Sequence, residues 1–315
     1  MQKRRWPFWL AAFFSFTEYG GCIILKAIQG PAAAETRKSR FRFSTSERGT
    51  RMHGAIQRFI KETAQQFNIG ITTYKHLQEL EESKALFEGA QMVAAFSERH
   101  AAALVKLLRA SKSQLHQDLF ALAELGMKRE GFFVEFGATN GVVLSNTYLL
   151  ETQFGWKGIL AEPAAHWHKA LKSNRHCAIE TTCVWRESNA ILEFNEVASE
   201  KELSTLSALN SSDIHAQERK KGRTYPVKTI SLADLLDKFD APKIVDYLSI
   251  DTEGSEYEIL SAFDFARHQF RVITCEHNFT PQREKIHALL TAHGYVRKFE
   301  QFSQCDDWYV LAEAN

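Results

Sequence analysis

Apolar runs alternate with helical patterns along the chain from about residue 131 onward. The runs predicted to form core strands are residues 132–134, 159–161, 178–185, 244–250 and 270–275. Helices are expected between them, at 146–154, where Ser145 can cap, and after Ser231, Ser255 and Pro281. Strands that alternate with helices favour an α/β fold with a doubly wound, mostly parallel sheet covered by helices on both faces.

Other segments of the chain show different patterns. Residues 295–302 and 308–312 are expected to close the sheet as an antiparallel pair, and 190–197 and 225–230 to form shorter strands. Between residues 55 and 110, apolar positions recur at helical spacing. They form two stripes: Ile56, Phe59, Ile60, Ala64 and Phe67, and then Leu104, Val105 and Leu108. We expect a helical layer that packs on the domain or mediates dimer contacts, with a substrate cap as the alternative.

Three parts of the chain follow from these patterns. Residues 1–50 are basic, partly apolar and expected to be poorly ordered, 51–112 form a helical extension, and 113–315 form the main domain. The apolar stretch 6–16 is too short to span a bilayer. Three interpretations remain open for this end: a poorly ordered or upstream-extended N-terminus, a membrane-surface anchor, and an export signal.

Composition restricts the partners of the protein. Hydrophobic residues make up 44% and charged residues 24%, as in a globular chain. Residues 1–58 hold eleven Lys and Arg but three acids, whereas the whole chain has a net charge of +1. The main domain is therefore net negative, which argues against nucleic acid as its partner. The five cysteines form no C-x-x-C pair, so we expect reduced thiols, no zinc or other metal site and a cytoplasmic protein.

The most informative motif follows the first apolar run. Its spacing is Glu135-x-Gly137-x-x-x-Gly141, and the second run ends in Glu162-Pro163. Glycines let the backbone approach a ligand closely, and an acid at the end of the second strand can bind ribose hydroxyls. An acid before the loop would repel a pyrophosphate but suits a cationic ligand, which favours S-adenosylmethionine over NAD.

Five motifs together resemble one known family. Residues 135–141 (EFGATNG), 144–148 (LSNTY), 155–158 (GWKG), 161–163 (AEP) and 251–254 (DTEG) are similar to those of FkbM-type methyltransferases, in the same order, and the resemblance covers about 113–312. It implies a class I, Rossmann-like methyltransferase domain that uses S-adenosylmethionine to methylate hydroxyls of sugars or sugar-bearing products. An antiparallel strand pair at the C-terminus is also usual in this class.

The carboxyl ends of the predicted strands supply the candidate site residues. Those expected to bind the cofactor are Glu135, Gly137, Ala138, Asn140, Gly141, Glu162, Pro163, Cys183, Val184 and Asp251. Those expected near the substrate are Ser204, Glu253 and Glu276. Asp251 and His277 end adjacent strands and are the candidate catalytic bases, alone or as a pair.

The sequence thus predicts an O-methyltransferase acting on a sugar hydroxyl of a glycan, lipopolysaccharide or glycosylated metabolite, as in polysaccharide biosynthesis. The first alternative is a non-catalytic protein that keeps the fold as a binding or scaffold module, and the second is an NAD-linked oxidoreductase. Peripheral membrane contact through the N-terminus and a homo-oligomer are both compatible with the sequence. The identity of the methyl acceptor is not encoded in any recognisable motif.

Overall fold

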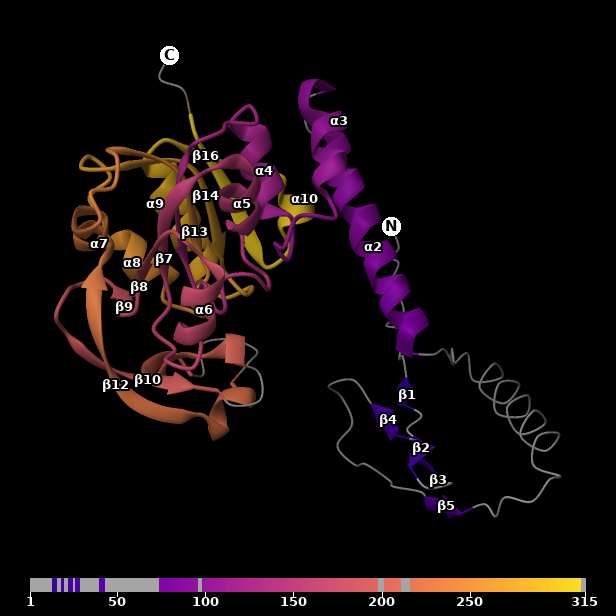
Figure 1. Ribbon diagram of the computed structural model, residues 1–315. Helices are drawn as coiled ribbons and strands as arrows, with labels where there is room; N and C mark the ends of the chain where they lie inside the picture. The colour runs from indigo at the N-terminus through magenta and orange to yellow at the C-terminus, as the bar shows by residue number, and fades with distance from the viewer. Residues whose placement is uncertain are drawn as a thin grey trace, which may run out of the picture. The chain divides into compact units, whose positions relative to one another are not determined.

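The computed structural model describes residues 74–95, 98–197, 201–210 and 216–312, with the backbone of five short strands before residue 43 (Figure 1). Those strands are β1 (Phe13–Ser15), β2 (Glu18–Tyr19), β3 (Cys22–Ile24), β4 (Lys26–Ile28) and β5 (Arg40–Arg42). β1 pairs with β4, and β3 pairs with β2 and β5, all antiparallel. The chain divides into two compact units, Met1–Ala85 and Leu86–Asn315.

A seven-stranded sheet forms the centre of the second unit. Its strands are, in spatial order, β15 (Tyr295–Lys298), β16 (Asp306–Leu311), β14 (Gln269–Glu276), β13 (Ile244–Ile250), β6 (Phe132–Phe136), β7 (Lys157–Ala161) and β8 (Ala178–Glu180). The five strands from β14 to β8 are parallel, and β16 is antiparallel to both of its neighbours. The predicted fold class, with its antiparallel C-terminal pair, is confirmed.

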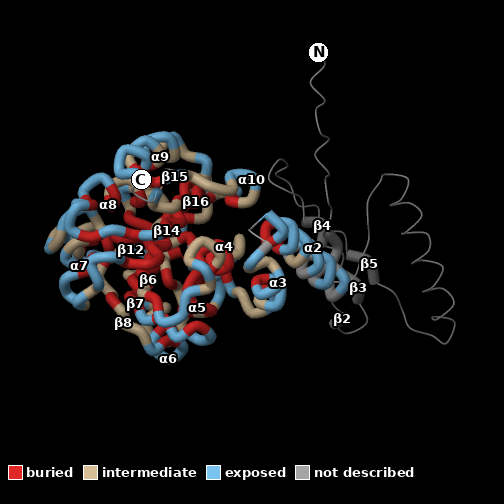
Figure 2. Tube along the Cα trace, turned by 90° about the horizontal axis from the view of Figure 1, so that it is seen from above, coloured by how far each residue is buried: buried red, intermediate tan, exposed pale blue. Residues whose placement is uncertain are grey.

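Helices cover both faces of this sheet (Figure 1). The first face packs against α7 (Leu232–Lys238), α8 (Glu256–Ser261) and α9 (Gln282–Ala292), and the second against α4 (Gln117–Glu124), α5 (Tyr148–Phe154) and α6 (His168–Asn174). Side chains alternate between faces along a strand, so Val134 packs with the first group and Phe133 with the second. Figure 2 shows the buried residues concentrated on the strands and the exposed ones on the outer sides of the helices.

Two helices precede the domain, α2 (Tyr74–Ala95) and α3 (Glu98–Leu107). Met92, Leu104 and Leu108 are buried in the same cluster as Leu119 of α4, whereas Val105 is exposed. The helical layer predicted for this region therefore includes packing on the domain, although its stripe at 56–67 lies outside the described residues. Among the described helices, none combines the length and apolar content needed to cross a bilayer.

A second, four-stranded sheet extends from the domain at the bottom of Figure 1. Its spatial order is β11 (Thr205–Leu206), β10 (Ile191–Glu196), β12 (Arg223–Ser231) and β9 (Cys183–Trp185). Three short 3-10 helices accompany it, η1 (Lys201–Leu203), η2 (Ser207–Leu209) and η3 (Glu218–Lys221). Cys183, Phe194 and Leu206 belong to its small core.

Three predicted elements differ from the structure. The run 178–185 is not one strand, because the Glu180 side chain accepts the N–H groups of Thr181 and Thr182 and the chain then leaves the large sheet for the small one. The strand expected at 295–302 ends at Lys298, where Phe299 adopts a left-handed conformation (φ 56°) before α10 (Glu300–Ser303). The helix expected from residue 146 begins at Tyr148.

Candidate active site

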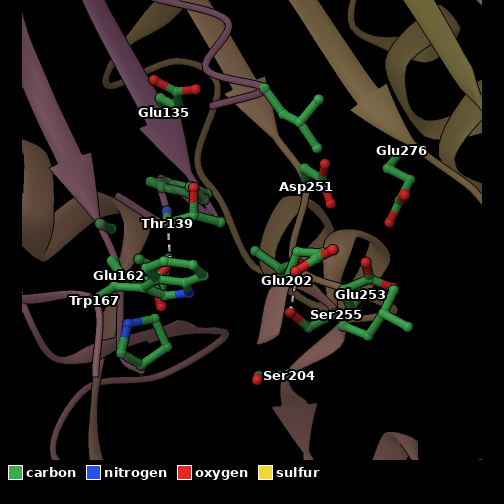
Figure 3. A pocket seen from close by; sticks show the side chains of 18 of the residues that line it. Glu135, Thr139, Glu162, Trp167, Glu202, Ser204, Asp251, Glu253, Ser255 and Glu276 are labelled. Atoms are coloured by element: carbon green, nitrogen blue, oxygen red, sulfur yellow. Dashed lines mark hydrogen bonds between the residues drawn. The ribbon is translucent and has the colours of Figure 1, made fainter. Parts of the chain in front are cut away.

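A cavity of about 290 Å³ lies at the carboxyl ends of the parallel strands. The residues that follow β6, β7, β13 and β14 form one side of it, and the 201–206 segment, which contains η1 and β11, lines the other (Figure 3). The direction in which the chain adds strands reverses between the neighbouring strands β6 and β13: β6 is followed by β7 on one side, and β13 by β14 on the other. Ligands bind at this switch point in sheets of this type.

Close packing explains the first glycine of the loop. Gly137 has φ +73°, and a Cβ added there would lie 1.9 Å from the backbone oxygen of Asp251. Gly141 has φ +79°, and a Cβ there would meet the side chains of Arg175 and Leu171 at 2.6 and 2.7 Å. The loop therefore needs its glycines for the contact between β6 and β13 and for the packing of Arg175, independently of any ligand.

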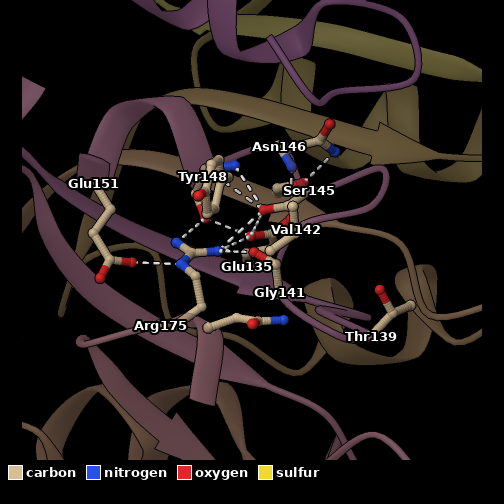
Figure 4. A network of polar contacts seen from close by, with 12 residues as sticks. Glu135, Thr139, Gly141, Val142, Ser145, Asn146, Tyr148, Glu151 and Arg175 are labelled. Atoms are coloured by element: carbon tan, nitrogen blue, oxygen red, sulfur yellow. Dashed lines mark hydrogen bonds and ion pairs between the residues drawn. The ribbon is translucent and has the colours of Figure 1, made fainter. Parts of the chain in front are cut away.

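Glu135 lines the cavity, but its carboxylate is held by the loop that follows it (Figure 4). Its Oε1 accepts the N–H of Asn146 at 2.7 Å, and its Oε2 accepts the hydroxyls of Ser145 and Thr147. The guanidinium of Arg175 lies 3.8 Å from Oε2 and donates to the Gly141 carbonyl at 3.1 Å. Glu135 thus fixes the 141–147 loop, and a direct contact with a cofactor ammonium stays a prediction.

Glu162 is buried at the end of β7, with its carboxylate in the cavity (Figure 3). Each of its oxygens accepts one backbone N–H at 2.8 Å, Oε2 from Thr139 and Oε1 from Ala164. Burial is the main reason that the pKa of Glu162 is raised to about 7, and the nearby carboxylate of Glu196 adds to it. The acid is therefore rigidly positioned beside the glycine loop, as predicted for a ribose-binding residue.

Three carboxylates gather at the other end of the cavity. Oxygens of Asp251, Glu253 and Glu276 lie within 4.8 Å of one another (Figure 3). Burial and the charges of Asp306 and Glu256 raise the pKa of Asp251 to about 7, and burial beside Asp251 raises that of Glu276 well above its usual range. Such a spacing would also suit a metal ion, but Arg219 already pairs with Glu253 at 2.7 Å, so we assign no metal to this cluster.

His277 does not line the cavity, contrary to the prediction that it faces the same pocket as Asp251. Glu276 is the last residue of β14 and lines the cavity with Asp251, whereas His277 follows the strand and contacts Asp307 of β16. Its Nδ1 accepts the N–H of Phe279 at 3.0 Å, and its Nε2 lies 3.8 Å from Asp307. Burial lowers the pKa of His277. The structure thus pairs Asp251 with Glu276, not with His277.

The remaining predicted residues divide into two groups. Pro163, Cys183, Val184 and Ser204 line the cavity. Ala138 and Asn140 do not line it. Ala138 is buried, and the side chain of Asn140 accepts the N–H groups of residues 142 and 143, so both stabilise the conformation of the glycine loop.

Sequence reasoning missed several cavity residues. Trp167, which lines the cavity beside Glu162, is one of them. The exposed Glu202 also reaches the cavity, but it belongs to the stretch 202–207, which is similar to one near the substrate side of FkbM-type chains. Asn146 lies within the LSNTY motif, and that motif was the signal that could have marked it.

Arg175 and Arg219 do not line the cavity but pair with Glu135 and Glu253, which do. Arg175 carries no motif, and Arg219 belongs to the basic cluster 219–223, a pattern typical of a solvated loop.

Solved structures of methyltransferases resemble the chain at low sequence identity. FkbM methyltransferase from Methylobacillus flagellatus KT is 12% identical, with a TM-score of 0.40 over 81% of this chain and 70% of the other. Precorrin-6y C5,15-methyltransferase from Geobacter metallireducens GS-15 is 12% identical, with a TM-score of 0.34 over 61% and 85%. A putative RNA methyltransferase from Pyrococcus horikoshii is 12% identical, with a TM-score of 0.31 over 72% and 98%.

A comparison with curated proteins found no match. The family model of the methyltransferase FkbM domain matches residues 135–305, more than half of the chain and the whole region from the glycine loop to β16. The resemblance inferred from the five motifs is confirmed, and the chain belongs to the FkbM methyltransferase family.

Proposed function

We propose that the protein is an S-adenosylmethionine-dependent O-methyltransferase that acts on a sugar hydroxyl of a glycan, lipopolysaccharide or glycosylated metabolite. The observation that carries the proposal is that Glu162, Asp251 and Glu276 meet around one cavity from the ends of three parallel strands. Membership of the FkbM family supports methyl transfer. The motif resemblance supports a sugar hydroxyl as the acceptor.

The cavity fits the proposed cofactor. Each Glu162 oxygen accepts one backbone N–H and retains a lone pair, so the carboxylate can also accept the two ribose hydroxyls. Asn146 is 7% exposed and lines the cavity, and among the described residues its Oδ1 has no hydrogen-bond partner. A buried acceptor of this kind calls for a donor such as an ammonium group. When bound, S-adenosylmethionine supplies a methyl group on a positively charged sulfur.

Asp251 is the proposed base. A sugar hydroxyl must lose its proton as it gains a methyl group, and a base works best when its pKa is near the working pH. The raised pKa of Asp251, about 7, meets that condition. Carboxylate oxygens of Glu276 and Asp251 lie within 4.8 Å of each other, so Glu276 can hold Asp251 in place or share its proton.

The polar groups of the acceptor end support a polyhydroxylated acceptor. Carboxylates accept hydrogen bonds from hydroxyls, and Asp251, Glu253, Glu276 and Glu202 all line this end. The Ser204 hydroxyl donates to the Lys201 carbonyl at 2.6 Å and accepts the N–H of Val197, so its role is to shape the wall. A methyl donor made in the cytosol supports a cytoplasmic location, and the basic N-terminus is compatible with peripheral membrane contact.

Cofactor binding is tested by thermal shift. S-adenosylmethionine and S-adenosylhomocysteine should each raise the melting temperature, whereas NAD should not, because only a ligand of the native state stabilises it. Glu162→Gln should weaken binding about tenfold or more, since hydrogen bonds to charged groups contribute about 1.5–3 kcal/mol. Glu193→Gln, an exposed glutamate on β10, is the matched control. Stabilisation by NAD alone would contradict the proposal.

The competing function is a non-catalytic binding module that keeps the fold. Both functions predict ligand binding, so transfer of a labelled methyl group to a panel of neutral, acidic and lipid-linked glycans is the deciding experiment. Label in a glycan that depends on Asp251 supports the enzyme. Cofactor binding with no label transferred to glycans or to cell-extract acceptors supports the binding module.

A further inference from the structure

Asp251 and Glu276 lack the partners that hold the buried carboxylates Glu135, Glu162 and Glu253 in the same cavity. Glu162 accepts two backbone N–H groups. Glu135 is paired with Arg175, and Glu253 with Arg219. Within the part of the chain that the structure describes, no Lys, Arg or His forms an ion pair with Asp251 or Glu276.

The surroundings of this pair add further negative charge. Glu135, Glu253, Glu256 and Asp306 are the titratable groups whose charges act on it, and the Cys305 thiol also lines this end of the cavity. In the described segments, two cations lie near the cavity and both are engaged: Arg219 donates through Nη2 to Glu253, and the Lys201 ammonium, which lines the cavity, lies 5.7 Å from the centre of the Trp167 ring. Two neighbouring carboxyl groups cannot both ionise easily in such a place, so in the absence of a cationic ligand the pair is expected to hold a proton.

Two independent features mark this end of the cavity as a place for a cationic ligand. One is the surplus of negative charge, which only a ligand or a proton can balance. The other is the buried amide oxygen of Asn146, which lines the same cavity and lacks a donor among the described residues. Its Nδ2 donates to Ser249, two residues before Asp251 on β13, so the amide is fixed in orientation.

We propose that the carboxyl pair Asp251–Glu276, whose oxygens lie within 4.8 Å of each other, receives the positive charge of the methyl donor. The pair gives up a proton to solvent when the cationic donor binds but keeps it when the neutral thioether product binds. This inference rests on the proposed use of S-adenosylmethionine. Because the expelled proton leaves a carboxylate behind, binding the donor would itself create the base.

The protons of one turnover then balance. The pair loses one proton at donor binding. In the transfer, the acceptor hydroxyl gives its proton to the pair as its oxygen gains the methyl group, and the donor sulfur keeps the electron pair of the broken bond. Departure of the neutral thioether leaves the pair protonated, as it began. The proton of the overall reaction is therefore released at the binding step, before the chemistry.

Calorimetry on the full-length protein tests this. Titrations with S-adenosylmethionine and with S-adenosylhomocysteine are run near pH 6.5–7 in phosphate and in Tris, whose different ionisation enthalpies report the protons released. We expect release of a substantial fraction of one proton with S-adenosylmethionine and little with S-adenosylhomocysteine. The affinity for the first should rise with pH by up to about tenfold per pH unit below the pKa of the pair, and that for the second should stay flat.

Three variants locate the source of the proton. Asp251→Asn and Glu276→Gln should each reduce the proton release and its pH dependence, whereas Glu202→Gln, which removes an exposed carboxylate of the same cavity, should leave proton release unchanged. Equal proton release with both ligands, or none with S-adenosylmethionine, would overturn the inference on the wild-type protein alone. Failure of the protein to bind S-adenosylmethionine at all would instead reject the proposed function on which the inference rests.

Discussion

The guanidinium of Arg219 bridges the two sides of the cavity. Its Nη2 donates to Glu253 Oε2 at 2.7 Å, and its Nε donates to the Leu203 carbonyl at 2.9 Å. Arg219 is 1% exposed, and Glu253 has a left-handed backbone (φ 59°) whose carbonyl accepts the Thr205 hydroxyl at 2.9 Å. The 201–206 segment is thereby attached to the loop after β13, which carries Asp251.

Removing the Arg219 side-chain charge should destabilise the protein strongly. Arg219→Met leaves the Glu253 carboxylate buried without its cation, which typically costs about 3–5 kcal/mol of the free energy of unfolding. Denaturant unfolding measures this loss, and Lys220→Met, at the exposed neighbouring position, is the control. The double variant Arg219→Met/Glu253→Met should recover part of the stability. A loss below about 1 kcal/mol in the single variant would show that the pair is not a structural bridge.

Gly137 should tolerate no side chain, even without a ligand. Gly137→Ala places a Cβ 1.9 Å from the Asp251 backbone oxygen, so β6 and β13 must separate. Gly126 is a matched control, because it also has a positive φ (+61°) but has nothing within 4 Å of an added Cβ. Gly126→Ala should cost about 1–2 kcal/mol from backbone strain alone, and Gly137→Ala about 1–3 kcal/mol more. Equal losses of unfolding free energy would rule out the clash.

The glycine loop also shows how far the sequence could predict this site. Apolar runs with polar ends located the five core strands and the acids at their tips, because parallel strands meet at one edge. The sequence linked Gly137 to a ligand, whereas the structure links it first to Asp251, since contacts between strands far apart in the chain leave no local pattern.

Long-range partners account for most of the other differences. Arg175 and Arg219 are buried and form ion pairs with Glu135 and Glu253. No spacing in the sequence could indicate these pairs. The sequence also could not show which residue at the end of β14 enters the cavity: Glu276 ends the strand and lines the cavity, whereas His277 follows it and contacts Asp307 of β16. A difference of one position along the chain therefore decides whether a histidine or a glutamate is the neighbour of Asp251.

Stability of the ligand-free protein should fall as the pH rises through neutrality. Burial raises the pKa of Asp118 and Asp306 to about 6 and that of Glu162 and Asp251 to about 7. In the unfolded chain these groups titrate near pH 4, so between about pH 4 and 7 the native state binds more protons than the unfolded state. Their stabilising contribution is complete below that window and is lost as the pH passes the raised pKa values.

The size of this effect can be measured by denaturant unfolding between pH 5 and 8. Each group that is protonated in the native state and ionised in the unfolded state makes the free energy of unfolding fall by about 1.4 kcal/mol per pH unit. Asp251→Asn should make the decline shallower, whereas Asp240→Asn, at an exposed turn, should not. Stability that rises from pH 5 to 8 would show that the cavity acids are ionised in the native state.

The catalytic assignment separates Asp251 and Glu276 from His277. Asp251 and Glu276 line the cavity, whereas His277 does not line it and contacts Asp307 of β16. With the acceptor identified by labelled-methyl transfer, Asp251→Asn and Glu276→Gln should lower kcat at saturating donor by about 10²–10⁴-fold, the usual contribution of a general base. His277→Gln should lower kcat less than tenfold, although the melting temperature should fall because the ring accepts the Phe279 N–H.

Donor affinity, measured on the same variants, distinguishes a base from a residue that only binds the cofactor. A base shows a loss of kcat that persists when the donor is saturating, whereas a purely cofactor-binding residue shows a loss that high donor concentration restores. The pH profile gives a second reading: because donor binding ionises the pair, the wild-type kcat at saturating donor should stay flat near neutrality, whereas kcat/KM for the donor should rise with pH, and Asp251→Asn should flatten that rise. His277 lies outside the cavity and has no route to the acceptor hydroxyl. A folded His277→Gln variant that loses kcat as strongly as Asp251→Asn would therefore contradict this assignment.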